Sequence, residues 1–94
     1  MALKVNEYFG GDVKSIGFDG AQGRATVGVM NPGSYEFSTT TVEVMTVIDG
    51  VLLVRLPGKT TASTYRSGEA FRVAAGETFH LAVSAATAYH CLYL

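Results

Sequence analysis

Short apolar segments alternate with turn signals along the whole chain. The segments are about five to eight residues long and rich in Val, Ile, Thr, Phe and Tyr, as expected for β-strands. The turn signals are "FDGAQG" at 18–23, "MNPG" at 30–33, "DG" at 49–50, "PG" at 57–58, "SG" at 67–68 and "AG" at 75–76. No segment keeps a helical period. The pattern predicts one all-β domain over residues 1–94, an antiparallel β-barrel or jelly roll whose closure removes exposed strand edges.

Two segments allow more specific predictions. In "EVMTVIDGVLLVRL", Asp49-Gly50 stands between two apolar runs and predicts a hairpin with a two-residue type I′ turn. In "GRATVGVM", Ala25, Val27 and Val29 fall on one face of a strand, and the other face carries Arg24 and small or polar residues. That second face could line a water-filled cavity as readily as it could face bulk solvent.

Composition limits the core and suggests a partner. The chain has 94 residues, of which 48% are hydrophobic and 16% charged. A chain of this length buries only about 60–65% of its unfolded surface on folding, so its core is thin. A second copy would cover apolar surface that the monomer cannot hide, and we expect a homodimer.

Charge and apolar runs argue against several partners. The net charge is −1 and the basic residues are scattered, so we expect neither nucleic acid nor a membrane as a partner. No apolar run approaches the roughly 18 residues of a spanning helix, and "MALKVNEYFG" lacks the apolar core of a signal peptide. Cys91 is the single cysteine, which excludes an internal disulfide and fits a reducing compartment. These features predict a cytoplasmic protein.

Two stretches resemble the paired motifs of the cupin barrels. "EVMTVIDG" is similar to the end of the first motif, and "GEAFRVAAGETFH" is similar to the second, with His80 in place and Ala74 where proline is usual. The histidine pair of the first motif is missing, because its positions fall in "EFST". A first-row metal in a cupin usually rests on three imidazoles and a carboxylate, and only His80 and Glu43 remain. The sequence therefore predicts a cupin without a metal or other cofactor.

A wider resemblance covers nearly the whole chain. The segments "NEYF", "VKSIGF", "GRATVGVM", "YEFST", "EVMTVIDG", "FHLAV" and "CLYL" are similar, in the same order, to the small single-domain cupins called pyrimidine/purine nucleoside phosphorylases. The resemblance implies a pentosyltransferase that converts a nucleoside and inorganic phosphate into a free base and pentose 1-phosphate. It also implies that both purine and pyrimidine nucleosides are accepted. The alternative is a non-enzymatic cupin that binds a small sugar or nucleotide metabolite, and a metal-dependent oxygenase or isomerase is a third possibility.

The residues offer candidates for each task in phosphorolysis. Cleavage of the N-glycosidic bond places positive charge on the sugar and negative charge on the leaving base, so the site must hold phosphate and relieve both charges. The expected phosphate contacts are Arg24, Ser38 and Thr39, since guanidinium groups grip oxyanions. The expected catalytic residues are Glu43 and His80, as proton donors to the base or, for Glu43, as a carboxylate at the sugar. The expected base-stacking face consists of Tyr35, Phe37 and Tyr89.

Overall fold

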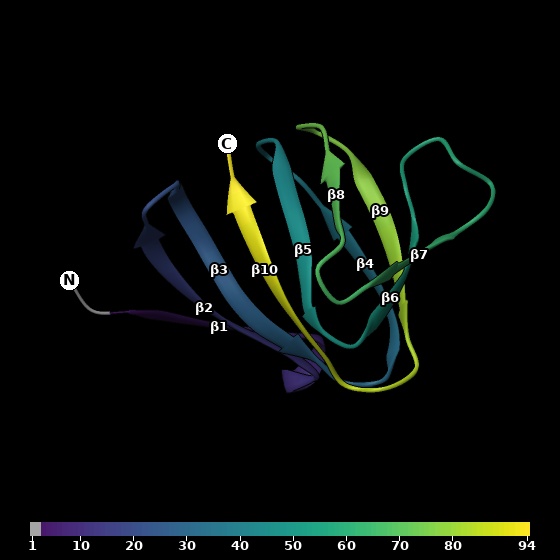
Figure 1. Ribbon diagram of the computed structural model, residues 1–94, viewed down its shortest axis with the longest axis horizontal. Helices are drawn as coiled ribbons and strands as arrows, with labels where there is room; N and C mark the ends of the chain where they lie inside the picture. Colours follow the sequence, from purple (N-terminus) through teal and green to yellow (C-terminus); the bar gives the residue numbers. More distant parts are fainter. Residues whose placement is uncertain (1–2) are drawn as a thin grey trace.

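The fold is built from two antiparallel β-sheets that lie face to face (Figure 1). The computed structural model describes residues 3–94. The first sheet contains six strands in the order β1-β2-β3-β10-β5-β8. Their bounds are β1 Lys4–Tyr8, β2 Val13–Gly20, β3 Gly23–Met30, β5 Glu43–Asp49, β8 Ala70–Val73 and β10 Thr87–Tyr93.

The second sheet is smaller and has four strands in the order β4-β9-β6-β7. Its members are β4 Gly33–Ser38, β6 Val51–Arg55, β7 Ser63–Arg66 and β9 Thr78–Val83. All strand pairs are antiparallel. The predicted all-β antiparallel architecture is confirmed. Within residues 3–94 the helical part is one 3-10 turn, η1 Phe9–Gly11, and no helix is long and apolar enough to cross a membrane.

The core fills the space between the two sheets. Strand alternation sends every second side chain inward, as in β9, where Phe79, Leu81 and Val83 are buried and His80 is not. In β3 the inward face carries Thr26, Gly28 and Met30 and the outward face Val27 and Val29. The polar face of "GRATVGVM" thus points into the molecule.

The predicted hairpin at Asp49-Gly50 is wrong, although both of its strands exist. β5 pairs with β10 and β8, whereas β6 pairs with β9 and β7, so the chain passes from one sheet to the other at this point. Asp49 does not have the positive φ that a type I′ turn requires, while Gly50 has φ of 117°. Gly50 is needed because a Cβ there would collide with the Thr87 side chain. A local pattern cannot distinguish such a corner from a hairpin.

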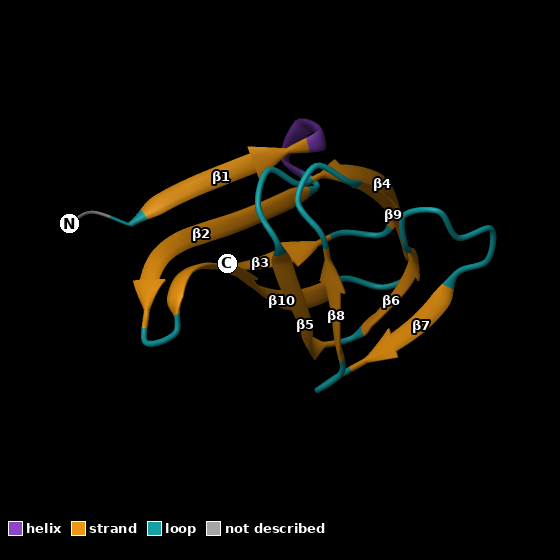
Figure 2. Cartoon of the chain, turned by 90° about the horizontal axis from the view of Figure 1, so that it is seen from above, coloured by secondary structure: helices purple, strands orange, loops and turns teal. Residues whose placement is uncertain are grey.

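β1, β2 and β3 form a wing that extends from one side of the molecule, and the end of β1 with the η1 turn lies beside β4 of the smaller sheet (Figures 1 and 2). β2 and β3 are joined by a true hairpin in which Gly20 pairs with Gly23. The inner face of this wing continues the inner wall of the six-stranded sheet.

Candidate functional site

A cavity of about 190 Å³ opens between the two sheets. It is lined by Tyr8, Ser15, Phe37, Ser38, Glu43, Met45, Phe79, Tyr89, Cys91 and Tyr93. The lining is divided by chemistry. The six-stranded sheet contributes the thiol, the carboxyl and most of the hydroxyls, whereas the four-stranded sheet contributes the phenyl rings of Phe37 and Phe79 and the Ser38 hydroxyl.

Glu43 is the acidic group of the polar wall. It begins β5 and is half-buried, with Cys91 Sγ donating a hydrogen bond to its Oε1 at 3.3 Å. Burial raises the pKa of Glu43 above its ordinary value, and the thiol hydrogen bond opposes this shift. Burial also raises the pKa of Cys91, so this side chain stays a neutral thiol that can donate. Glu43 is therefore a poorly solvated carboxyl facing the cavity.

Tyrosine hydroxyls extend the polar wall on either side of Glu43. The Tyr93 hydroxyl lies 3.2 Å from Thr26 Oγ1, and burial raises the pKa of Tyr93. Burial raises the pKa of Tyr89 to about 12, with Ser15 opposing the shift. Both tyrosines therefore carry neutral hydroxyls at neutral pH, suited to hydrogen bonds with a hydroxylated ligand.

Arg24 lies on the same inner face of the six-stranded sheet as Glu43, and its guanidinium lies over Gly17 of β2. Leu92 of β10 pairs with Ala25 of β3, so the next residues along these strands, Tyr93 and Arg24, lie side by side. Tyr93 in turn pairs with Glu43 of β5. Two strand spacings place the Arg24 and Glu43 backbones about 10 Å apart. Arg24 Nη1 is 3.5 Å from Asp19 Oδ1, and both side chains are about half-exposed. An exposed pair of this kind is worth about 0–1 kcal/mol, so the guanidinium can turn to another anion.

The structure separates His80 from Glu43, and the expectation that both act in one site is corrected. His80 faces the outer surface of the smaller sheet, because Phe79 and Leu81 on either side of it point into the core. Its Nε2 lies 2.8 Å from Glu36 Oε1 on the neighbouring strand. His80 and Glu36 line an outer groove of about 480 Å³ that is distinct from the cavity.

Of the other sequence candidates, three reach the cavity and two do not. Phe37, Ser38 and Tyr89 line it. Tyr35 is buried beside the core and donates its hydroxyl to Asn31 O at 2.6 Å, and Thr39 is buried with its hydroxyl bonded to Ala74 O at 2.6 Å. Both hydroxyls hold loops together, so Tyr35 and Thr39 are structural in this fold.

Sequence reasoning missed most of the polar wall. Tyr8, Ser15, Cys91 and Tyr93 line the cavity but were not among the site residues expected from the sequence. A signal did exist, because Ser15 interrupts the inward alternation of "VKSIGF", and Tyr93 and Cys91 alternate with Tyr89 in the final strand. Such alternation gives the face of each residue but not which strands enclose a cavity.

The cavity residues do not fit the metal site that is common among cupin barrels. In residues 3–94 no group of three or more His, Cys, Asp or Glu side chains is placed to hold a metal ion. The cavity offers one carboxyl, and the thiol beside it has a raised pKa that disfavours the thiolate a metal would bind. These residues offer too few ligands for that metal site.

The sequence comparisons show the family to which the chain belongs. Residues 3–93 match the family model described as pyrimidine/purine nucleoside phosphorylase. A protein of that name from Tolumonas auensis is 56% identical over 91 residues, covering 97% of this chain and 98% of the relative. Another from Pseudomonas putida is 54% identical, with 97% of both chains covered.

The solved structures extend the comparison to the fold. The crystal structure of a protein of unknown function from Vibrio parahaemolyticus has a TM-score of 0.96 and 47% identity, with both chains covered completely. An RmlC-like cupin from Shewanella frigidimarina has a TM-score of 0.74 at 16% identity, covering 95% of this chain and 80% of its own. The latter supports the fold alone. With its two antiparallel sheets and its match over 3–93, the chain belongs to the pyrimidine/purine nucleoside phosphorylase family and has a cupin fold.

Proposed function

We propose that the protein is a metal-independent nucleoside phosphorylase that accepts both purine and pyrimidine nucleosides. The family name supports nucleosides and phosphate as substrates. The observation that carries the proposal is the two-sided cavity, with the carboxyl and most of the hydroxyls on one wall and the two phenyl rings on the other. A nucleoside has the same division, since its pentose is polyhydroxylated and its base is a planar ring. A cytoplasmic role in nucleotide salvage is part of this proposal.

The size of the cavity indicates where the substrate lies. At about 190 Å³ it is smaller than the roughly 300 Å³ at which small-molecule pockets begin. Only part of a nucleoside would fit in the cavity. The rest would extend over the inner face of the β1–β3 wing. That face also carries Arg24, to which we assign the binding of phosphate.

The proposed reaction breaks the N-glycosidic bond and joins a phosphate oxygen to the anomeric carbon. The bonding electron pair leaves with the base, which takes up the proton that the attacking phosphate loses. Positive charge develops on the sugar, and a carboxylate that water solvates poorly stabilises such charge more strongly than a carboxylate in bulk water would. We assign this role to Glu43, which also accepts hydrogen bonds from the pentose hydroxyls.

Ring stacking accounts for the proposed tolerance toward bases. Every base has a flat face that an aromatic side chain can contact, whereas discrimination requires hydrogen bonds to the base edges. Phe37 presents an aromatic surface to the cavity, and the Ser38 hydroxyl next to it is bonded to Thr78 Oγ1 at 3.0 Å. The wall of the smaller sheet thus offers a stacking surface with few edge-directed groups.

The experiment that tests the function is an incubation of purified protein with uridine or inosine, with and without phosphate. We expect free base to appear only when phosphate is present, and to appear equally in the presence of a chelator. Thermal stabilisation by uridine without release of uracil would instead identify a binding protein. Loss of activity in chelator would contradict metal independence.

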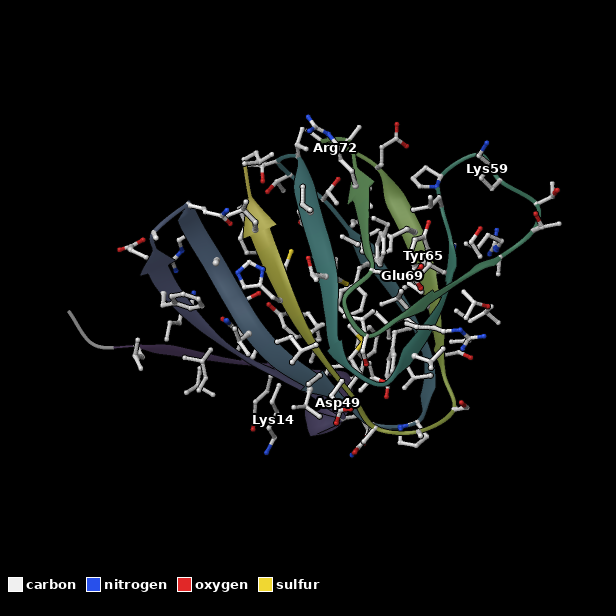
Figure 3. All side chains as sticks on the ribbon, viewed as in Figure 1. Lys14, Asp49, Lys59, Tyr65, Glu69 and Arg72 are labelled. Atoms are coloured by element: carbon white, nitrogen blue, oxygen red, sulfur yellow. The ribbon has the colours of Figure 1, made fainter. Side chains whose placement is uncertain are left out.

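Arg24→Ala is predicted to raise the phosphate KM by on the order of tenfold, because a charge-assisted contact to the oxyanion is lost. The uridine KM should change little. Arg72→Ala is the matched control, since Arg72 follows the buried Phe71 on β8 and points to the outer surface near the end of that strand (Figure 3). An unchanged phosphate KM in Arg24→Ala would remove Arg24 from the site.

We further propose that the protein is a homodimer formed through the outer face of the six-stranded sheet. This face exposes an apolar row in which Ile16 and Val27 are paired across strands, and Val29 lies beside them. These side chains are 44%, 39% and 50% exposed, respectively. A closed pair of identical copies would cover this face on both partners.

Val27→Lys is predicted to convert the dimer into a monomer, as measured by light scattering after size-exclusion chromatography. A lysine there would bury a charge at the centre of the paired faces. Val51→Lys is the control, because Val51 is similarly exposed, at 37%, but lies on the outer face of the smaller sheet. A native monomer, or a Val27→Lys dimer, would contradict this interface.

A further inference from the structure

Two of the aromatic rings at the cavity have little surface left for a ligand. Phe79 is 1% exposed and Tyr89 4%, because the protein itself covers them. Tyr8 is different: it lines the same cavity and is 44% exposed. A base can stack only on aromatic surface that it can reach, so the accessible ring of Tyr8 is the strongest candidate among the lining residues.

Tyr8 is placed to complete the aromatic wall. It ends β1 in the wing, across the cavity from the smaller sheet, and its ring centroid lies 6.1 Å from that of Phe37. The two rings meet at 79°, in an edge-to-face arrangement. Tyr8 of the wing and Phe37 of the smaller sheet are thus neighbouring rings in the lining of the cavity.

The backbone after Tyr8 is held in an uncommon conformation. Phe9 has φ of 53°, and Gly10 and Gly11 follow with φ of 67° and 95°. A left-handed phenylalanine costs free energy and persists only where neighbouring contacts enforce it. Here the Phe9 ring packs against Tyr35 at 4.9 Å and Phe37 at 5.5 Å between centroids. These contacts anchor the turn and thereby fix where the Tyr8 ring stands.

We propose that Tyr8 is a substrate-binding residue whose ring stacks on the base of the bound nucleoside, while the Phe37 ring, at 79° to it, meets the edge of the base. This inference rests on the proposed nucleoside substrate. It adds the residue that contacts the flat face of the base. Because stacking does not distinguish purine from pyrimidine edges, Tyr8 contributes to the binding of both classes.

The chain contains no tryptophan, which allows a direct test. In Tyr8→Trp the single indole reports on stacking, and we expect its fluorescence to be quenched by uridine and by inosine without phosphate. Phe18→Trp is the control, because Phe18 contacts His90 on the outer face of the larger sheet and does not line the cavity. Quenching in Phe18→Trp equal to that in Tyr8→Trp would overturn the proposal, as would no quenching in Tyr8→Trp at saturating nucleoside.

Kinetics provide a second readout that a merely structural role would not produce. Tyr8→Leu is expected to raise the KM for uridine and for inosine by about tenfold or more, the range typical of a lost base stack. Tyr8→Phe should retain nearly native values, and the phosphate KM should stay unchanged in both variants. A KM effect confined to one base class, or equal losses in Tyr8→Leu and Tyr8→Phe, would contradict the assignment.

The two experiments separate this inference from the proposed function. Quenching of Tyr8→Trp by nucleosides in a protein that releases no base would support the stacking role and contradict phosphorolysis. Phosphate-dependent release of base by the native protein, with native KM values in Tyr8→Leu, would support phosphorolysis and overturn the role of Tyr8.

Discussion

Glu43→Gln is expected to lower kcat by on the order of a hundredfold while leaving the fold intact. The variant removes the negative charge that stabilises the cationic sugar, and losing one such electrostatic contact costs about 10²–10³ in rate. Glutamine keeps the size of the side chain and an oxygen that can accept the Cys91 thiol hydrogen bond. Steady-state kinetics with uridine and phosphate measure the effect.

Glu36→Gln is the matched control for this prediction. Glu36 is also a strand carboxylate with a hydrogen-bond partner, but it faces the outer groove and bonds to His80. Its replacement should leave kcat close to the native value. A Glu43→Gln enzyme within about twofold of native kcat/KM would contradict the assigned role, because even one lost charge-assisted contact exceeds that change.

The raised pKa of Glu43 adds a measurement of stability that does not depend on catalysis. Because the folded pKa lies above the ordinary 4.5, ionisation of Glu43 is less favourable in the folded protein than in the unfolded chain. The native protein should therefore lose stability relative to Glu43→Gln as the pH rises from about 4.5 through the raised folded pKa. Thermal melts of both proteins across this pH range should diverge in that direction, and a constant difference would contradict it.

Gly50→Ala is expected to have the largest effect on stability, about 2–6 kcal/mol in the free energy of unfolding. The φ of 117° at Gly50 is outside the range that alanine adopts without strain. Its new methyl group would also collide with Thr87, whose fully buried hydroxyl donates to Ala85 O at 2.9 Å and accepts from Val51 N at 3.2 Å. Strain and collision therefore add at the corner between the two sheets.

Gly58→Ala separates these two contributions. Gly58 also has a positive φ, 75°, but nothing lies within 4 Å of a Cβ at that position. Lys59 next to it lies in the open loop between β6 and β7 (Figure 3). We expect Gly58→Ala to lose only about 1–2 kcal/mol from backbone strain. Chemical denaturation of both variants would contradict the account if their losses were equal.

The fold class was predictable from the sequence because strand alternation and turn residues are local signals. The period-2 pattern of "GRATVGVM" correctly separated Val27 and Val29 from the inward face. Strand partners were less predictable, as the corner at Gly50 shows. Whether two successive strands pair or enter different sheets depends on packing against a distant strand, here through Thr87.

The candidate site was predictable only in part, for the same physical reason. Motif spacing led to Glu43, which lines the cavity, and equally to His80, which does not. The two residues lie on strands of different sheets, and the direction of His80 is set by its buried neighbours Phe79 and Leu81. The sequence did not predict Tyr8 as a site residue, because its position at the cavity depends on how the β1–β3 wing packs against the smaller sheet.

The most direct test of the account is phosphorus NMR of the native protein after dialysis against a chelator, incubated with uridine and inorganic phosphate. The account predicts a pentose 1-phosphate signal that grows in equal amount with free uracil, and no uracil when phosphate is omitted. Uracil release without phosphate, or product only after a metal ion is restored, would contradict metal-independent phosphorolysis in this cavity.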